Sequence, residues 1–110
     1  MVSGRYDNFV AKLKAAVFES PGTVSTELRR AIADRQWTSV PLALAPYVEN
    51  VALHAYKVTD EDVEALKRAG YSEDEIFEAT SAAAVGAALM CLERGMAVVR
   101  TSRTQPGSVA

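Results

Sequence analysis

The chain has 110 residues, of which 49% are hydrophobic and 24% charged, and its formal net charge is −2. This length predicts one domain, residues 1–110, with a single core. The 12 basic residues are offset by 14 acidic ones and form no dense cluster, which argues against nucleic acid as a partner. The chain opens with no long apolar segment, and its one cysteine cannot form an intramolecular disulfide, so we expect a cytoplasmic protein.

The first helix is expected to follow a flexible tail, residues 1–6, with Asp7 or Asn8 as its cap. Four apolar residues at helical spacing are expected to face the core: Phe9, Leu13, Ala16 and Val17. The Ser-Pro-Gly sequence at residues 20–22 predicts a break after this helix.

A second helix is predicted to begin at Thr23 or Ser25. Its expected buried stripe is Leu28, Ala31 and Ile32, with Glu27, Arg29 and Arg30 on its other faces. Trp37 lies just beyond the expected end of this helix, where it covers either an edge of the core or an oligomer contact.

Residues 39–58 form the third helical region. Pro46 lacks an N–H group and crowds the preceding turn, so the regular helix either starts near Pro46 or bends there. Its expected apolar face consists of Tyr47, Val48, Val51, Ala52, Ala55 and Val58.

Two capping patterns follow in quick succession. Thr59 precedes three acidic residues, a pattern typical of the first turn of a helix, and Gly70 is suited to end that helix. Ser72 and Glu75 then have the spacing of a capping box. We therefore predict a helix, a sharp corner and a second helix.

The second of these helices is rich in small residues. From Ala79 to Ala88 every residue except Val85 is Ala, Gly, Ser or Thr, which favours a closely packed core helix. Its uncharged run ends at Leu92 and is shorter than the ~20 residues of a bilayer span, so we expect no membrane association. No strand pattern is present. The sequence thus predicts an all-α fold of about five helices, with a long alanine-rich C-terminal helix and a flexible tail, residues 101–110.

His54 and Cys91 are the candidate catalytic residues. His54 is the only histidine, so proton transfer by imidazole would have to use it, beside Glu49 or Tyr56. Cys91 lies within the long helix, where a buried cysteine behaves as a small hydrophobic residue. A metal site would need carboxylates whose spacing is better explained by helix capping, and no nucleotide fingerprint is present, so neither a metal nor a cofactor is predicted.

The segment from Val48 to Leu89, and above all LKRAGYSEDEIFEAT, resembles the AhpD-like, or carboxymuconolactone decarboxylase-like, superfamily. The resemblance extends from about Thr23 to Leu92. It implies an AhpD-like helical bundle whose subunits assemble into a homo-oligomer, either a dimer, a trimer or a hexamer. The abundance of apolar residues and the small-residue helix also favour close contacts between subunits.

The peroxidase members of that superfamily carry a C-x-x-C-x-x-x-H motif. Counting back from Gly70 places its cysteines at Ala55 and Val58 and its histidine at Asp62. A dithiol cycle needs one thiolate to attack and a second thiol to resolve the product, and these residues cannot supply either. The resemblance therefore implies a degenerate pocket at Ala55, Val58 and Asp62.

Three functions fit the sequence. The first is an oligomeric AhpD-like protein without redox activity that binds a small molecule in the degenerate pocket. The second is a peroxidase-like or decarboxylase-like enzyme that uses displaced residues, Cys91 or His54. The third is a non-catalytic helical module that binds another protein through exposed apolar faces.

Overall fold

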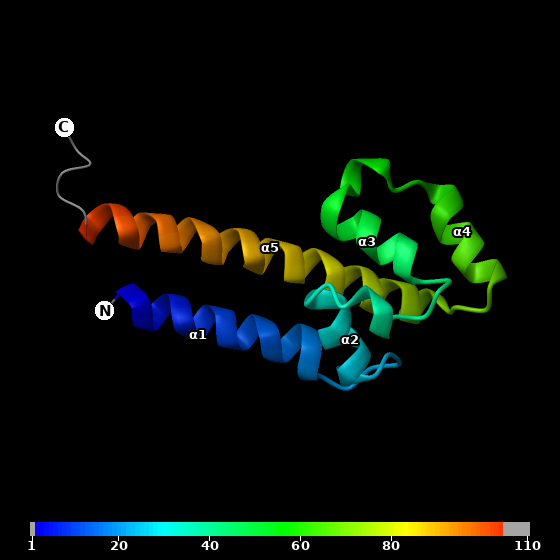
Figure 1. Ribbon diagram of the computed structural model, residues 1–110. Helices are drawn as coiled ribbons and strands as arrows, with labels where there is room; N and C mark the ends of the chain where they lie inside the picture. Colours follow the sequence, from blue (N-terminus) through cyan, green and yellow to red (C-terminus); the bar gives the residue numbers. More distant parts are fainter. Residues whose placement is uncertain (1, 105–110) are drawn as a thin grey trace.

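The computed structural model describes residues 2–104, which form five α-helices and no strand. The helices are α1 (Val2–Lys14), α2 (Thr26–Ala33), α3 (Ala45–Leu53), α4 (Asp60–Arg68) and α5 (Glu73–Thr104). Figure 1 shows α5 as the spine of the molecule, with α1 and α2 on one side and α3 and α4 around its first half. The prediction of an all-α fold with about five helices and a long C-terminal helix is confirmed.

The predicted corner between α4 and α5 is present with both of its caps. The Thr59 hydroxyl accepts the Asp62 N–H at 3.3 Å, and the Asp62 carboxylate accepts the Thr59 N–H at 2.9 Å. Ser72 and Glu75 make the equivalent pair of bonds, at 3.1 and 2.8 Å. Gly70 has a φ of 104°, a left-handed conformation that costs glycine little, so it ends α4 as expected.

The observed starts of α2 and α3 also agree with the starts predicted from the sequence. Ser25 caps α2 by accepting the Leu28 N–H at 3.1 Å, which decides between the two expected starts. Pro46 lies in the first turn of α3, where its missing N–H leaves no bond unmade. α3 then ends at Leu53, and residues Ala55–Lys57 form a separate 3-10 turn, so the third region contains a shorter helix than expected.

α1 differs from the prediction in its start and in its buried face. It begins at Val2, so residues 2–6 are helical and neither Asp7 nor Asn8 is its cap. Phe9 is 59% exposed and Ala16 is also exposed, whereas Val10, Leu13 and Val17 pack toward the core. Both stripes have helical spacing, so the sequence pattern alone cannot choose between them. α1 then continues into a π-helical turn, Ala15–Glu19, which buries Phe18.

The core lies where α2 and α3 cross the first half of α5. Ile32, Leu44 and Val48 are its largest fully buried side chains, and Trp37 packs against its edge. Along α5 the buried residues are Ile76, Ala79, Ala82, Ala83, Gly86 and Leu89. A Cβ atom on Gly86 would lie 2.7 Å from both Cα and the carbonyl oxygen of Ala33, so α2 and α5 approach closely enough to exclude any side chain there.

Arg29 is buried, although the sequence placed it on an outer face of α2. Only 4% of it is exposed, and its guanidinium donates to the carbonyl oxygens of Val24, Val17 and Ser20 at 3.1, 2.9 and 2.6 Å. The chain between α1 and α2 folds back over this side chain, so its carbonyls replace the water that Arg29 would otherwise bind. Arg29 thereby fixes that connection against α2.

α5 is unusually long and only partly covered. Figure 1 shows α1 beside its second half, with the start of α1 and the end of α5 at the same end of the molecule. From Glu73 to Thr101, α5 is long and apolar enough to cross a membrane on length and composition alone, a test that core helices of soluble proteins also pass. Residues 101–104, expected to be flexible, continue the helix, while Met1 and residues 105–110 of the expected tails lie outside the described residues.

Candidate functional site: a cavity between α3 and α4

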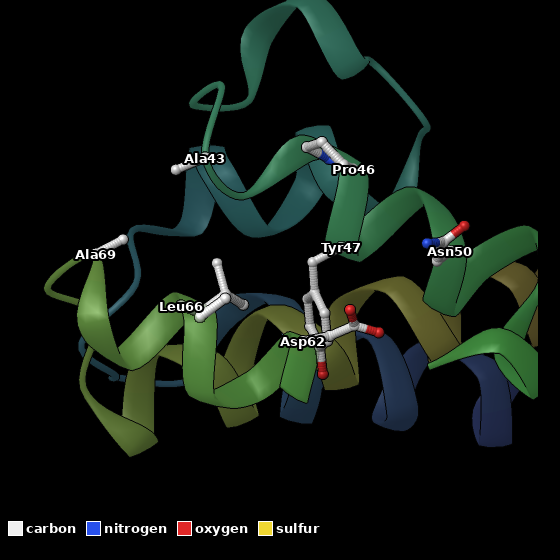
Figure 2. Close-up of a pocket in the computed structure, with 8 residues that line it drawn as sticks. Ala43, Pro46, Tyr47, Asn50, Asp62, Leu66 and Ala69 are labelled. Carbon is white, nitrogen blue, oxygen red and sulfur yellow. The ribbon is translucent and has the colours of Figure 1, made fainter. Parts of the chain in front are cut away.

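A cavity of about 240 Å³ lies between α3 and α4. Figure 2 shows α3 above it and α4 below, with Tyr47 pointing from α3 toward α4 and Leu66 pointing from α4 toward α3. The residues that line it are Ala43, Pro46, Tyr47, Asn50, Asp62, Ala65, Leu66 and Ala69. Three of the lining residues are alanines, Ala43 before α3 and Ala65 and Ala69 within and just after α4, and their small side chains leave this space open.

Local structure positions the polar groups of the cavity. Asp62 is held in the first turn of α4 by its reciprocal bonds with Thr59. Tyr47 is buried and its hydroxyl lies 2.7 Å from the Thr80 hydroxyl, which itself donates to the Ile76 carbonyl at 2.6 Å. The Tyr47 hydroxyl therefore donates to Thr80, and the ring is fixed against α5 as one wall of the cavity.

The lining combines apolar walls with two polar side chains at one end. The Asn50 amide can donate and accept hydrogen bonds, and the half-buried Asp62 carboxylate can accept them. None of the lining residues is cationic. The cavity is therefore suited to a small, largely apolar molecule that carries a hydroxyl or amine group as a hydrogen-bond donor.

The structure brings only one of the three degenerate-pocket residues into this cavity. Asp62 lines it, but neither Ala55 nor Val58 does. Ala55 is exposed in the 3-10 turn after α3, and Val58 is partly buried against the core. Tyr47 and Asn50 were not identified from the sequence as lining residues. For Asn50 a signal was present: it lies four residues after Pro46, so the two residues share one face of α3.

His54 lies at the C-terminal end of α3 and does not line the cavity. Its ring packs edge-on against the ring of Tyr56, with the centroids 6.1 Å apart, and Tyr56 itself is exposed. Within the described residues the His54 side chain makes no hydrogen bond and no ion pair with Glu49. Of the two partners expected for His54, only Tyr56 is adjacent.

Cys91 is exposed on α5, so its interpretation as a buried hydrophobic residue is wrong. The helical face that carries Cys91 also carries Phe77, which is 71% exposed. The two candidate catalytic residues thus lie on different elements, and both are outside the α3–α4 cavity. Among residues 2–104, no three potential metal ligands gather at one place.

Comparison of the chain with known protein families, with characterised proteins and with solved structures finds no match. The AhpD-like resemblance therefore stays a prediction from the residues that carry it.

Proposed function

We propose that this chain is an AhpD-like helical protein without a redox pair, which binds a small molecule in the cavity between α3 and α4. The observation that carries the proposal is the cavity itself, with Asp62 in its wall at the position where the resemblance puts the histidine of the peroxidase motif. Its volume of about 240 Å³ is below the ~300–1,000 Å³ typical of sites for drug-sized ligands, which favours a compact molecule.

The arrangement of polar and apolar groups supports a ligand with one polar end. Tyr47 and Leu66 offer apolar surface, and Asn50 and Asp62 offer acceptors for a hydroxyl or amine. An anionic ligand would meet the Asp62 carboxylate with no cation among the lining residues, so an anion is disfavoured.

The cysteine content supports a function without dithiol chemistry. The chain has one cysteine, and it lies on the exposed face of α5 rather than in the cavity. A thiolate and a resolving thiol from one chain cannot both be present. We expect no peroxide consumption with a dithiol reductant; turnover that persists in Cys91→Ser would contradict the proposal.

Binding can be tested by amide chemical-shift mapping with phenethylamine and cyclohexanol as probes, since each joins an apolar body to one donor group. We expect shifts of α3 and α4 amides around Asn50 and Asp62. Ala65→Phe, which fills the cavity from α4, is expected to remove them. Glu64→Phe is the matched control, because this neighbouring residue is exposed and does not line the cavity. Shifts that are absent, or that survive Ala65→Phe unchanged, would overturn the proposal.

A further inference from the structure

The outer face of α5 carries an uncharged stripe that no other helix covers. Its members follow one another at alternating intervals of four and three residues: Phe77, Ser81, Ala84, Ala88, Cys91, Gly95 and Val98. This interval pattern keeps side chains on one face of a helix and is the spacing of a helix-pairing seam. The stripe lies opposite the buried face of α5, which contains Ala79, Ala83 and Gly86.

The stripe is long and exposed. From Phe77 to Val98 it extends for ~32 Å at the rise of an α-helix. Phe77 is 71% exposed and Val98 is 65% exposed; of the five small residues between them, Ser81 is half-buried and the other four are exposed. A continuous exposed surface of this kind marks an interaction site rather than scattered apolar residues.

The order of side-chain sizes along the stripe is nearly the same from either end. A large residue begins and ends it, Ser81 corresponds to Gly95, Ala84 corresponds to Cys91, and Ala88 is central. A symmetric dimer uses the same surface on both subunits, so it needs a surface that is complementary to itself when reversed. We infer that this stripe is the contact between two copies of the chain, with their α5 helices antiparallel.

Shape supports the antiparallel direction at both ends. A hollow of about 340 Å³, lined in part by Ala16, Val17 and Phe77, opens beside the start of the stripe. In the antiparallel pair, Val98 and Val99 of the second copy come to this end of the stripe. The small residues in the middle let the two backbones approach closely, while the bulky end of each helix meets the hollow of the other.

Charge supports the same direction. α5 begins with the exposed acidic residue Glu73, which lies four residues before Phe77 and therefore on the same face as the stripe. An antiparallel pair places the acidic first turns of the two copies at opposite ends of the contact, and it also opposes the two helix dipoles. A parallel pair would place like charges side by side.

A second copy also fits this face better than a lipid bilayer does. Glu78 precedes the uncharged run of α5, and Glu93 and Arg94 follow it, so the run is shorter than the ~20 predominantly apolar residues that a bilayer span requires. The face opposite the stripe is already buried against other helices, so the apolar surface that remains is a strip along one side of α5 rather than a belt around it. A strip of this kind is typical of paired helices in water.

The association can be measured by sedimentation velocity or by light scattering on the full chain, where a dimer has twice the 11.8 kDa mass of the monomer. Ala88→Glu introduces two like charges at the centre of the contact, and we expect it to weaken association at least ~100-fold. Leu42→Glu is the matched control, because Leu42 is 93% exposed in the turn before α3, away from the stripe. A monomer at all concentrations, or a dimer unaffected by Ala88→Glu, would overturn the proposal.

The direction of pairing can be tested by oxidation with oxidised glutathione. We expect that the native chain and the variant Ala84→Cys/Cys91→Ser both stay uncrosslinked, because antiparallel pairing offsets identical residues along the helix. Ala84→Cys alone retains Cys91 and is expected to form intermolecular disulfides. Within one helix these two positions are ~10 Å apart, too far for an internal bond. Crosslinking of either single-cysteine protein would indicate parallel pairing and contradict the inference.

A vesicle-binding assay tests the remaining alternative, that the stripe binds a membrane surface. The proposal predicts that the native chain stays in the supernatant when it is spun with phosphatidylcholine–phosphatidylglycerol vesicles. A monomer that sediments with these vesicles, and loses this property in Ala88→Glu, would assign the stripe to a membrane surface and overturn the dimer.

Discussion

The two halves of α5 are both rich in small residues, yet they have different surroundings. In the first half, Glu73–Met90, six residues are buried on the side of α2 and α3, and four of them are small: Ala79, Ala82, Ala83 and Gly86. In the second half, none of residues 91–101 is buried, and Figure 1 shows only α1 beside it. Gly86 and Gly95 show the contrast most clearly: a Cβ atom on Gly86 would collide with the backbone of Ala33, whereas one on Gly95 would have no heavy atom within 4 Å.

This difference shows that a small residue has two distinct uses in a helix. Where another helix is present, a missing side chain allows close approach of the two backbones. Where none is present, the same residues leave a smooth surface that is available to a second molecule. Composition alone cannot distinguish these uses.

The largest effect is expected for Gly86→Ala. Its new methyl group would lie 2.7 Å from two backbone atoms of Ala33, which cannot rotate aside, so α2 and α5 must separate at a cost of about 3 kcal/mol. Gly95→Ala is the matched control and should stabilise α5 by ~0.5–1 kcal/mol through helix propensity alone. Urea unfolding in the Ala88→Glu background measures both without a contribution from self-association. Equal effects at the two positions would contradict the contrast.

Arg29 and Arg30 provide a second paired test, on the helix that anchors the first half of α5. Arg29→Met removes donors to three carbonyl oxygens in a buried setting, and we expect a loss of about 2–3 kcal/mol. Arg30→Met removes only an exposed ion pair with Glu19 and should cost less than ~1 kcal/mol. Chemical denaturation of the two variants makes this comparison. If Arg29→Met is as mild as Arg30→Met, the guanidinium does not hold the connection between α1 and α2.

Arg29 also shows which kind of feature could not be predicted from the sequence. The caps at Thr59 and Ser72 and the glycine stop at Gly70 could be predicted, because each depends on groups within a few residues of one another. The burial of Arg29 depends on how the chain between α1 and α2 folds back, and the sequence pattern carries no sign of it. The same holds for the exposure of Cys91, which depends on which face of α5 the other helices leave open.

The candidate site was predictable only in part for the same reason. Asp62 was reached through the family resemblance, at a position in the first turn of α4 that local capping already defined. Tyr47 and Asn50 belong to the cavity because α3 crosses near α4, which is a property of the tertiary structure. Ala55 and Val58 were placed by counting along a motif, but the chain leaves α3 at Leu53 and carries them away from the cavity lining.

A smaller and pH-dependent effect is expected at Glu78, which ties α5 to the segment before α2. Burial opposes ionisation of this carboxyl, but the N–H groups of Thr23 and Val24, at 3.0 and 2.8 Å, together with the positive charge of Arg29, more than compensate and lower its pKa from the ordinary 4.5. A lowered folded-state pKa means that the stabilisation is complete above the unfolded-state value and is lost as pH falls through the folded-state value. Glu78→Gln should therefore cost about 1 kcal/mol at pH 7 and progressively less below pH ~4.5.

The measurement is urea unfolding of Glu78→Gln and of the native chain at several pH values between 7 and 3. Glu93→Gln serves as the control, because Glu93 is exposed on the same helix and accepts no hydrogen bond from another described residue. Its effect on stability should be small at every pH. A cost for Glu78→Gln that stays constant down to pH 3 would show that the two backbone bonds do not depend on the charge.

The smallest expected effect concerns Tyr47, which joins α3 to the first half of α5. Tyr47→Phe keeps the ring as a wall of the cavity and removes only the donor to Thr80, whose own bond to Ile76 remains, so we expect a loss of about 0.5–1 kcal/mol. A double-mutant cycle with Thr80→Val isolates the coupling between the two hydroxyl groups. Because the apolar wall is unchanged, Tyr47→Phe should still bind phenethylamine. A cycle with zero coupling would mean that packing alone holds α3 on α5, and loss of the probe would mean that the hydroxyl, rather than the ring, belongs to the binding site.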